Sequence, residues 1–410
     1  MNFIDFVFFF YMFAGMYMMS LFLFLYLCGR NNLFDYPKAK IEPVSIVVPC
    51  YNEAAEIGEA IESLLKLDYP KNMIEIIVVD DKSKDNSAEI VRKYASKYKN
   101  VRLIVNKRNS GGAAEPTNIG IMAAKYPYIA VADADSAPKP DALMKMIGFL
   151  QNDKKVGAVT CSVLAKEPKT FVQKLQNIEY AVIAMTRKLL DVVDAVYVTP
   201  GPFALYRKKY LLEAGLFDTK NLTQDIEIVW RLRSKGYLAR MCLATAVYSA
   251  TPKKIWAWWR QRIRWNIGGT QTLIKYRNYL FKAGMLGTFI LPFFAFSLFL
   301  GIFGLGVFSY LFVRRFIISY LITKYSLYAN ATLIRMQDVS FSPSILNFLG
   351  IIMFIMGLGF TLFYLFTMRK DVIKKHNVFN ILFYLIVYLS VYPFIMITGL
   401  VKLATGRYSW

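Results

Sequence analysis

Ala132-Asp133-Ala134-Asp135-Ser136 is the stretch that decides the fold, because it directly follows the apolar run Tyr128 to Val131. A short apolar run of this kind is typical of a buried strand. Side chains two residues apart in extended backbone point the same way, so Asp133 and Asp135 should project together beyond the carboxyl edge of a sheet. Open α/β sheets bind ligands along that edge. Two carboxylates with no histidine or cysteine nearby suit Mg²⁺ or Mn²⁺ bridging to phosphate oxygens, although a solvated loop has the same pattern.

The composition indicates a membrane protein. The chain has 410 residues, of which 56% are hydrophobic, and a mean hydropathy of +0.36, which is too apolar for an ordinary soluble enzyme. Lys and Arg total 50 against 28 Asp and Glu, giving a net charge of +22 that favours anionic lipid surfaces and anionic substrates. The long apolar segments argue against nucleic acid as the main partner.

Histidine and cysteine are scarce. The one histidine, His376, lies in a basic loop between apolar segments, so any general base is expected to be a carboxylate. The four cysteines contain no Cys-x-x-Cys pair. This spacing predicts reduced, buried thiols rather than a disulfide framework or a zinc site.

Membrane segments are predicted at both ends. Phe6 to Leu27 is apolar and long enough to cross a bilayer, so residues 1–29 are expected to form a retained anchor, not a cleaved signal peptide. The basic residues after it place the next region in the cytoplasm. Residues 285–402 are predicted to hold about three more spans, which are Met285 to Val313, Ile345 to Met368 and Val378 to Val401. A re-entrant or fifth segment near Phe316 to Leu333 remains an alternative. We therefore expect a multi-pass protein of the cell membrane.

Residues 43–250 are predicted to form a cytoplasmic, doubly wound α/β domain, because apolar runs alternate with helical patterns. The expected strands are Val44 to Val48, Ile74 to Val79, Val101 to Val105, Tyr128 to Val131 and Val156 to Cys161. The expected helices include Glu56 to Leu67, Ser87 to Tyr98 and about Phe171 to Val192. A further strand over Ala195 to Leu205 should bend or bulge at Thr199-Pro200-Gly201-Pro202-Phe203, either to meet a substrate or as an edge distortion.

Residues 251–284 interleave basic side chains with Trp256, Trp258, Trp259 and Trp265. A helix of this composition is expected to lie in the plane of the lipid headgroups. Its basic groups would face lipid phosphate and its tryptophans would sit at the interface.

Acids follow the first two predicted strands as well. The first strand ends at Pro49, and Tyr51 and Glu53 lie in the turn that follows. A tyrosine ring there can stack on a flat base, and the glutamate can accept hydrogen bonds from a ring nitrogen or ribose. Asp81 follows the second strand and could accept from a uracil N–H. Each residue alone fits an ordinary turn equally well. The glycines of the loop 109–118 either approach a phosphate or belong to a plain loop.

Two further stretches carry candidate chemistry. Asp225 lies at the start of an amphipathic helix. Its negative charge there either interacts favourably with the helix dipole or serves as a general base. The shortage of histidine favours the general base. In Gln261-Arg262-Ile263-Arg264-Trp265, two arginines can neutralise a diphosphate while the indole stacks on a sugar ring. An interfacial helix explains the tryptophans but not Gln261.

In this order, these residues resemble the membrane-embedded glycosyltransferase family 2 enzymes with a GT-A (Rossmann-like) catalytic domain. That branch includes hyaluronan, chitin, cellulose and poly-N-acetylglucosamine synthases, and also ceramide glucosyltransferase. The resemblance covers roughly Val44 to Trp265. Its most specific part is Gln-x-x-Arg-Trp following Thr-x-Asp.

The resemblance implies a role for each matching residue. The donor site would comprise Pro49, Tyr51, Glu53, Asp81, Asp133, Gln261, Arg262 and Arg264. Asp135 would bind Mg²⁺ or Mn²⁺ directly, together with Asp133, and Asp225 would be the catalytic base. Gly201, Phe203 and Trp265 would lie beside the acceptor.

Two positions depart from the family pattern. Gln224 stands where the family usually has a glutamate before the base, and Gly112-Ala113-Ala114 stands where the family usually has Gly-Lys-Ala. These departures leave the donor and processivity open.

Three functions are therefore compared. The first is an inverting transfer from a nucleotide-diphosphate sugar, expected to be UDP-linked, that extends a β-linked polysaccharide and passes it into the membrane. The second is a single transfer to a lipid acceptor. The third is a non-catalytic transporter or nucleotide sensor, which the near absence of charge inside the apolar segments disfavours.

Overall fold

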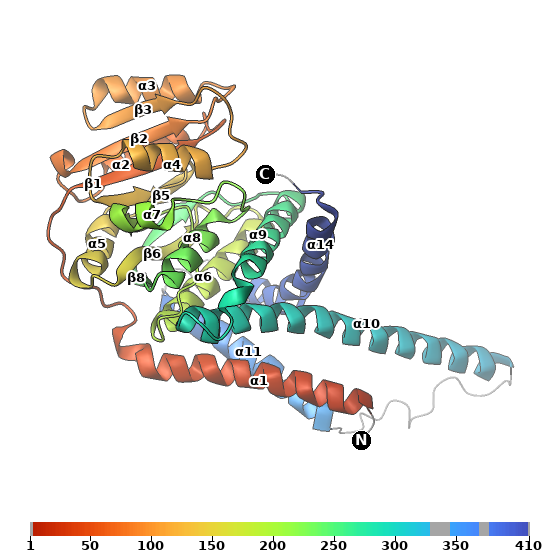
Figure 1. Cartoon of the computed structure of the whole chain (residues 1–410). Helices are drawn as coiled ribbons and strands as arrows, with labels where there is room; N and C mark the ends of the chain where they lie inside the picture. The colour runs from red at the N-terminus through yellow and green to blue at the C-terminus, as the bar shows by residue number, and fades with distance from the viewer. Residues whose placement is uncertain (1–2, 329–344, 369–376, 409–410) are drawn as a thin grey trace.

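A mixed eight-stranded sheet forms the core of the α/β part of the chain, and the long helices α1 (Phe3–Gly29) and α10 (Leu291–Tyr328) extend away from it (Figure 1). The structure is a computed structural model that describes residues 3–328, 345–368 and 377–408. The strand order is β3-β2-β1-β4-β7-β6-β8-β5. The strands are β1 (Val44–Cys50), β2 (Ile74–Asp80), β3 (Val101–Val105), β4 (Tyr128–Val131), β5 (Ser136–Pro138), β6 (Val156–Ala165), β7 (Ala204–Arg207) and β8 (Leu238–Ser249). The five strands expected first along the sequence are all present, and three of them extend further than expected.

Parallel pairing brings the predicted acids to one edge of the sheet. β1 pairs in parallel with both β2 and β4, and Val47 lies between Ile77 and Val131 in register. Every residue of these three strands is buried, and most of them are apolar. The buried polar residues Ser45 of β1 and Glu75 of β2 are hydrogen-bonded to each other at 2.5 Å. The turns that follow them therefore emerge side by side.

Helices cover both faces of the sheet. On one face, Ile57, Val91 and Leu143 pack from α2, α3 and α5. On the other face, Ile121 and Met185 pack from α4 and α6. The helices of this part are α2 (Ile57–Leu65), α3 (Ser87–Lys97), α4 (Ala114–Ala123), α5 (Ala142–Asn152), α6 (Phe171–Asp191), α7 (Lys208–Ala214) and α8 (Gln224–Ser234), with 3-10 turns at Arg30–Asn32 and Lys71–Met73.

The strand expected over Ala195 to Leu205 is mostly wrong. Only Ala204 and Leu205 belong to a strand, β7, which runs antiparallel to both β4 and β6. Pro200 and Pro202 lack the N–H that a ladder needs, so the preceding segment forms a loop instead of a bent strand. The antiparallel β7 also makes the sheet mixed, within the α/β fold that the sequence predicts.

The tryptophan-rich segment forms α9 (Ile255–Tyr276), followed by a 3-10 turn at Arg277–Tyr279. It packs against α8 and the C-terminal helix α14 (Tyr392–Thr405), beside which it lies in Figure 1. Trp256 is 72% exposed, but Trp258 and Arg262 are buried. The face of α9 that contacts α14 is covered by protein, so the predicted position in the headgroup plane concerns only its exposed face, which includes Trp256.

Three helices in the described part of the chain are long and apolar enough to cross a membrane: Phe6–Asn32, Leu286–Tyr328 and Val378–Thr405. The corresponding elements are α1 (Phe3–Gly29), a π-helical turn η4 (Leu286–Ile290) with α10 (Leu291–Tyr328), and α13 (Val378–Phe383) with the turns η6 (Tyr384–Tyr388) and η7 (Leu389–Val391) leading into α14. α11 (Ile345–Met368) contains a shorter apolar stretch, Ile351–Thr367, which is not one of these three helices.

The structure also bears on the predicted fifth membrane segment and on the cysteines. α10 continues through Arg314 and Arg315 to Tyr328, so the start of the suggested fifth segment belongs to the same helix. Residues 329–333 of that segment, and His376 with the basic loop 369–376, lie outside the described residues. All four cysteines are free, as predicted, but Cys28 is exposed rather than buried.

Candidate active site

One cavity of about 740 Å³ gathers the predicted site residues at the carboxyl edge of β1, β2 and β4. The residues that both line it and were predicted are Pro49, Tyr51, Glu53, Asp81, Asp133, Asp135, Gly201, Asp225, Gln261, Arg264 and Trp265. They come from the end of β1, from the loops after β1, β2 and β4, from the loop before β7 and from the helices α8 and α9. The expected convergence of these distant positions is therefore present.

Two predicted site residues lie elsewhere. Phe203 is fully buried in the hydrophobic core beneath the sheet, so it offers no surface to an acceptor. Arg262 is also outside the cavity, where its guanidinium pairs with Glu179 of α6. The assignment of Arg262 to diphosphate binding is replaced accordingly, because the group is 2% exposed and already paired.

The cavity concentrates several carboxylates close enough to raise one another's pKa. Burial raises the pKa of Asp133, and the charges of Asp135 and Asp225 raise it further, while Arg264 opposes the shift. Burial likewise raises the pKa of Asp135, and burial together with Asp135 raises the pKa of Glu53 to about 7. Such a group of acids is stabilised by a bound cation.

Asp133 and Asp135 fit a divalent metal ion. Carboxylate oxygens are the preferred ligands of Mg²⁺, and Mg²⁺ sites commonly use one or two carboxylates plus substrate phosphates. Among the described residues, no group of three or more histidine, cysteine, aspartate or glutamate side chains is arranged to hold a metal ion. The remaining ligands would therefore come from water and a bound substrate.

Asp81 organises the loop 106–112 that lines one end of the cavity. Its Oδ1 accepts a hydrogen bond from Asn106 Nδ2 at 2.6 Å, and its Oδ2 accepts from the backbone N–H and the hydroxyl of Ser110 at 2.9 and 2.7 Å. Gly111 follows with a positive φ of 79°, a conformation that glycine adopts without strain. The carboxylate thus shapes the loop in addition to facing the cavity.

The turn after β1 is held by the neighbouring loop after β2. Asn52 has a φ of 55°, and its side chain accepts from the backbone N–H of Lys84 at 2.8 Å. Ser87 accepts from the backbone N–H of Glu53 at 2.8 Å, so its hydroxyl ties the two loops together. This arrangement leaves the ring of Tyr51 40% exposed at the cavity.

Asp225 lies in the first turn of α8. The backbone N–H of Ile226 donates to its Oδ1 at 3.0 Å. Burial raises the pKa of Asp225, whereas this hydrogen bond and the charges of Arg264 and Arg187 lower it. α9 passes close to the start of this helix, because a Cβ added at Gly268 would lie 2.3 Å from the hydroxyl oxygen of Thr223. Close helix packing therefore fixes the position of the carboxylate.

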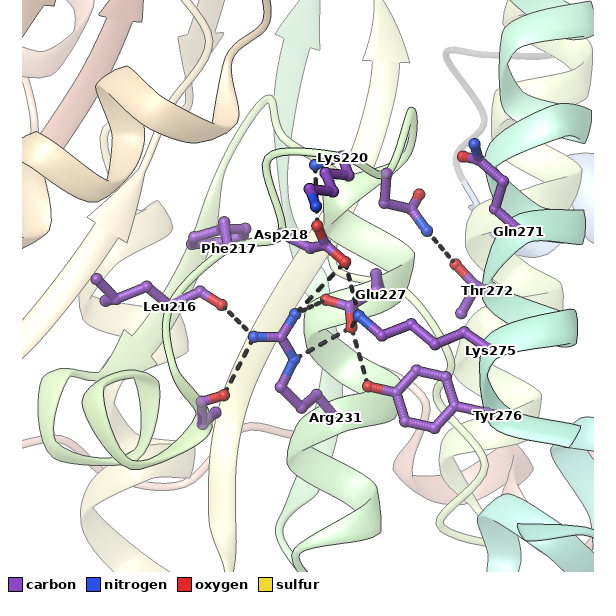
Figure 2. Close-up of polar contacts among 12 residues, drawn as sticks. Leu216, Phe217, Asp218, Lys220, Glu227, Arg231, Gln271, Thr272, Lys275 and Tyr276 are labelled. Carbon is purple, nitrogen blue, oxygen red and sulfur yellow. Dashed lines mark hydrogen bonds and ion pairs between the residues drawn. The ribbon is translucent and has the colours of Figure 1, made fainter. Parts of the chain in front are cut away.

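A buried polar cluster holds α8 against α9 (Figure 2). Glu227 is fully buried and accepts from Arg231 Nε at 3.1 Å, from Lys275 Nζ at 2.6 Å and from Tyr276 Oη at 2.9 Å. Lys275 also donates to Asp218 at 2.6 Å. Since Glu227 lies two residues after Asp225, the cluster anchors the helix that carries the candidate base.

Sequence reasoning missed the cavity residues of α6. Tyr180, Ala184 and Arg187 line the cavity at a spacing of four and then three residues, which places them on one helix face. The ring of Tyr180 stacks on that of Trp265 with centroids 6.4 Å apart. Arg187 is 4% exposed, and its Nε has no hydrogen-bond partner. A helical-periodicity search of residues 171–192 would have grouped them, but only the fold shows which face meets the cavity.

The chain resembles curated polysaccharide synthases in its sequence. It is 32% identical over 246 residues to poly-β-1,6-N-acetyl-D-glucosamine synthase of Staphylococcus aureus, covering 60% of this chain and 59% of that protein. It is 32% identical over 268 residues to the synthase of the same name from Staphylococcus epidermidis, covering 65% and 64%. The chain therefore matches less than two thirds of the length of these relatives.

The whole fold also matches a solved enzyme structure. Mannosyltransferase PcManGT from Pyrobaculum calidifontis, solved with GDP-Man and Mn²⁺, superposes with a TM-score of 0.62 at 18% identity and covers 97% of this chain and 99% of that one. This similarity supports the GT-A type of α/β fold expected from the sequence. The family model described as "Glycosyltransferase like family 2" matches residues 42–268, which is more than half of the chain. The chain therefore belongs to glycosyltransferase-like family 2.

Proposed function

We propose that this chain is a membrane-bound inverting glycosyltransferase that uses a nucleotide-diphosphate sugar, UDP-linked, to extend a β-linked polysaccharide. The observation that supports the proposal most directly is the gathering of Asp135, Asp225 and Arg264 in one cavity. A family 2 domain and relatives that are polysaccharide synthases agree with it.

In this proposal, Asp225 is the general base. The acceptor hydroxyl oxygen forms a bond to the anomeric carbon, its proton passes to the Asp225 carboxylate, and the bond to the diphosphate breaks with its electron pair. Attack from the face opposite the leaving group inverts the anomeric centre. General-base catalysis of this kind commonly contributes about 10²–10⁴ in rate.

The donor lies between the strand-edge loops and α9. Tyr51, Glu53 and Asp81 would hold the nucleotide, while Gln261 and Arg264 would face the diphosphate. Mg²⁺ or Mn²⁺ held by Asp135 and Asp133 would supply positive charge to the leaving diphosphate. Gly201 and Trp265 would border the acceptor.

The membrane arrangement supports a multi-pass protein of the cell membrane with a cytoplasmic catalytic domain. Three helices of the described part are long and apolar enough to cross a bilayer, and α10 begins shortly after α9, which contributes Trp265 to the cavity. A growing glycan held at that indole would start next to the bilayer.

A screen of UDP- and GDP-sugars with Mg²⁺ or Mn²⁺ tests the proposal. The purified chain in detergent is incubated with each donor, and both nucleotide release and product size are measured, with Asp225→Asn as the inactive control. Nucleotide release with a ladder of products supports the polysaccharide synthase. Lack of donor turnover with every nucleotide sugar contradicts enzymatic activity and favours the sensor or transporter alternative.

Single transfer to a lipid acceptor is the second candidate. It is favoured by the small number of helices in the described residues, three, that are long and apolar enough to cross a membrane, because a polymer path needs spanning helices around it. It predicts one lipid-soluble product in the same screen, in place of a ladder.

A further inference from the structure

A buried ion pair lies just behind the cavity. Arg262 of α9 donates through Nε to Glu179 Oε1 at 3.2 Å, and its NH2 pairs with the other carboxylate oxygen. Glu179 is 3% exposed and Arg262 is 2% exposed. Breaking such a pair leaves a charge buried without compensation, so the two side chains hold each other in place.

The C-terminal membrane helix completes this pair. Tyr388 donates to Glu179 Oε2 at 2.7 Å, and Tyr392 donates to Oε1. Trp258 Nε1 donates in turn to Tyr388 Oη at 2.5 Å. Both tyrosines belong to the apolar segment Val378–Thr405, one helical turn apart, so a candidate membrane span supplies two donors to a carboxylate behind the active site.

Arg262 also contacts two residues of the cavity. Its NH1 donates to Gln261 Oε1 at 2.6 Å, and its guanidinium lies 4.0 Å from the ring centroid of Trp265. Tyr180, the neighbour of Glu179 in sequence, stacks on the ring of Trp265 and also lines the cavity. One buried cation therefore orients an amide and an indole that both face the cavity.

α9 and α14 also approach each other closely beside Trp265. A Cβ added at Gly399 would lie 2.4 Å from Asn266 Oδ1, so the two helices meet with almost no space between them. A shift of α14 would therefore reach both Asn266 and the tyrosines bonded to Glu179.

We propose that Arg262 is a positioning residue for Trp265 and Gln261, and that Glu179, Tyr388 and Tyr392 make this positioning depend on the C-terminal membrane helix. The contacts of Arg262 stand by themselves, whereas the expected effect on transfer rests on the proposed function, which places Trp265 beside the acceptor. The indole would thereby keep the orientation needed to hold a sugar while the product passes along the membrane helices.

Fluorine NMR of the full chain labelled with 5-fluorotryptophan tests the positioning directly. The chain has six tryptophans, and the resonance lost in Trp265→Phe identifies the one of interest. We expect Arg262→Lys, and the double change Tyr388→Phe with Tyr392→Phe, to move this resonance by more than its linewidth. Arg260→Lys, an exposed arginine on the same helix, should leave it in place. A resonance that stays unmoved in both test variants overturns the proposal.

Kinetics then test the consequence. In Arg262→Lys, the KM for the acceptor should rise about 3- to 30-fold, which is the range expected from loss of the cation–π contact with Trp265. The KM for the donor and the rate of sugar transfer to water should each change less than about twofold. The effect should shrink in a Trp265→Phe background, because coupled residues are not additive. An equal effect in both backgrounds overturns positioning through Trp265. A moved resonance with unchanged acceptor KM upholds the positioning and instead removes the acceptor role from the proposed function.

Glu179→Gln keeps the test decisive if Arg262→Lys does not fold. This variant retains the shape and accepting oxygen of the side chain but removes its charge, and UDP-induced thermal stabilisation reports whether the donor site is intact. The same displaced Trp265 resonance is expected. An unmoved resonance in a folded Glu179→Gln protein contradicts the proposal.

Discussion

The backbone of Gly201 lies against the carboxylate of Asp133. A Cβ added at Gly201 would sit 2.7 Å from Asp133 Oδ1 and 2.9 Å from Oδ2, closer than side chains pack. The loop before β7 thus has a glycine where it passes a buried acid of the proposed metal and diphosphate site. The loop and the acid are coupled, although they are far apart in sequence.

Gly201→Ala should displace Asp133 and weaken metal binding. Loss of a group that orients a metal ligand typically costs about 10–100-fold in affinity, and we expect a decrease of that size for Mn²⁺ measured by calorimetry in the presence of UDP. Gly269→Ala is the matched control, because nothing lies within 4 Å of the added Cβ. Unaltered Mn²⁺ affinity in Gly201→Ala would show that Asp133 does not depend on this contact.

Asp225→Asn should reduce transfer by about 10²–10⁴-fold, because an amide cannot take the acceptor proton. UDP binding should remain, since the nucleotide end of the cavity is formed by other loops. Glu89→Gln removes an exposed first-turn acid from α3 and should leave transfer unchanged. Sugar transfer at the normal rate by Asp225→Asn would refute its assignment as the base.

The metal-free protein should lose stability as pH rises from about 4.5 to 7. Burial and Asp135 raise the pKa of Glu53 from 4.5 to about 7, and burial also raises the pKa of Asp133. Between the unfolded and folded pKa values the folded state binds more protons, so its stability is fully present below the unfolded value and is lost as pH rises through the folded value. Thermal unfolding in EDTA across this range measures the slope.

Mn²⁺ should restore more stability at pH 7.5 than at pH 5, because it binds the ionised carboxylates. Asp133→Asn combined with Glu53→Gln should flatten the EDTA profile. A metal-free Tm that rises with pH over the same interval would contradict this electrostatic description of the cavity.

Arg187→Met should raise the Tm while lowering transfer. Arg187 is 4% exposed with an unpartnered Nε, and burial lowers the pKa of its guanidinium, so the charge destabilises the folded state. Because Arg187 lines the cavity and its charge acts on Asp225, we expect its loss to lower transfer.

The adjacent cation gives a contrast for that experiment. Lys188 Nζ lies 3.0 Å from Asp191 Oδ2, so Lys188→Met breaks a buried ion pair. The free energy of unfolding should fall by up to about 3–5 kcal/mol, which lowers the Tm. Opposite Tm shifts for the two neighbours are expected by differential scanning fluorimetry. A lower Tm in Arg187→Met would mean that its charge is compensated in the folded chain.

The sequence by itself determined the sheet edge and the acids on it. The short, mostly apolar and β-branched runs at Val44, Ile74 and Tyr128 predict buried strands, and alternation with helical patterns predicts parallel pairing. The residues after each run then meet at one edge of the sheet. The positions of Asp81 and Asp133 follow from chain connectivity and strand geometry alone. Strand formation and the order of residues after each strand are local properties, because they depend on residues that are close together in the sequence.

The tertiary structure decided which side chains face the cavity. Arg262 and Arg264 belong to one short motif, yet residues two apart on a helix point in directions about 200° apart, so only one of them faces the ligand. Helical periodicity shows that the two differ, but it does not show which face meets the cavity. That choice depends on Glu179, Tyr388 and Tyr392, which come from two other helices. Packing between distant segments made the distinction, because a buried guanidinium is stable only where such partners surround it.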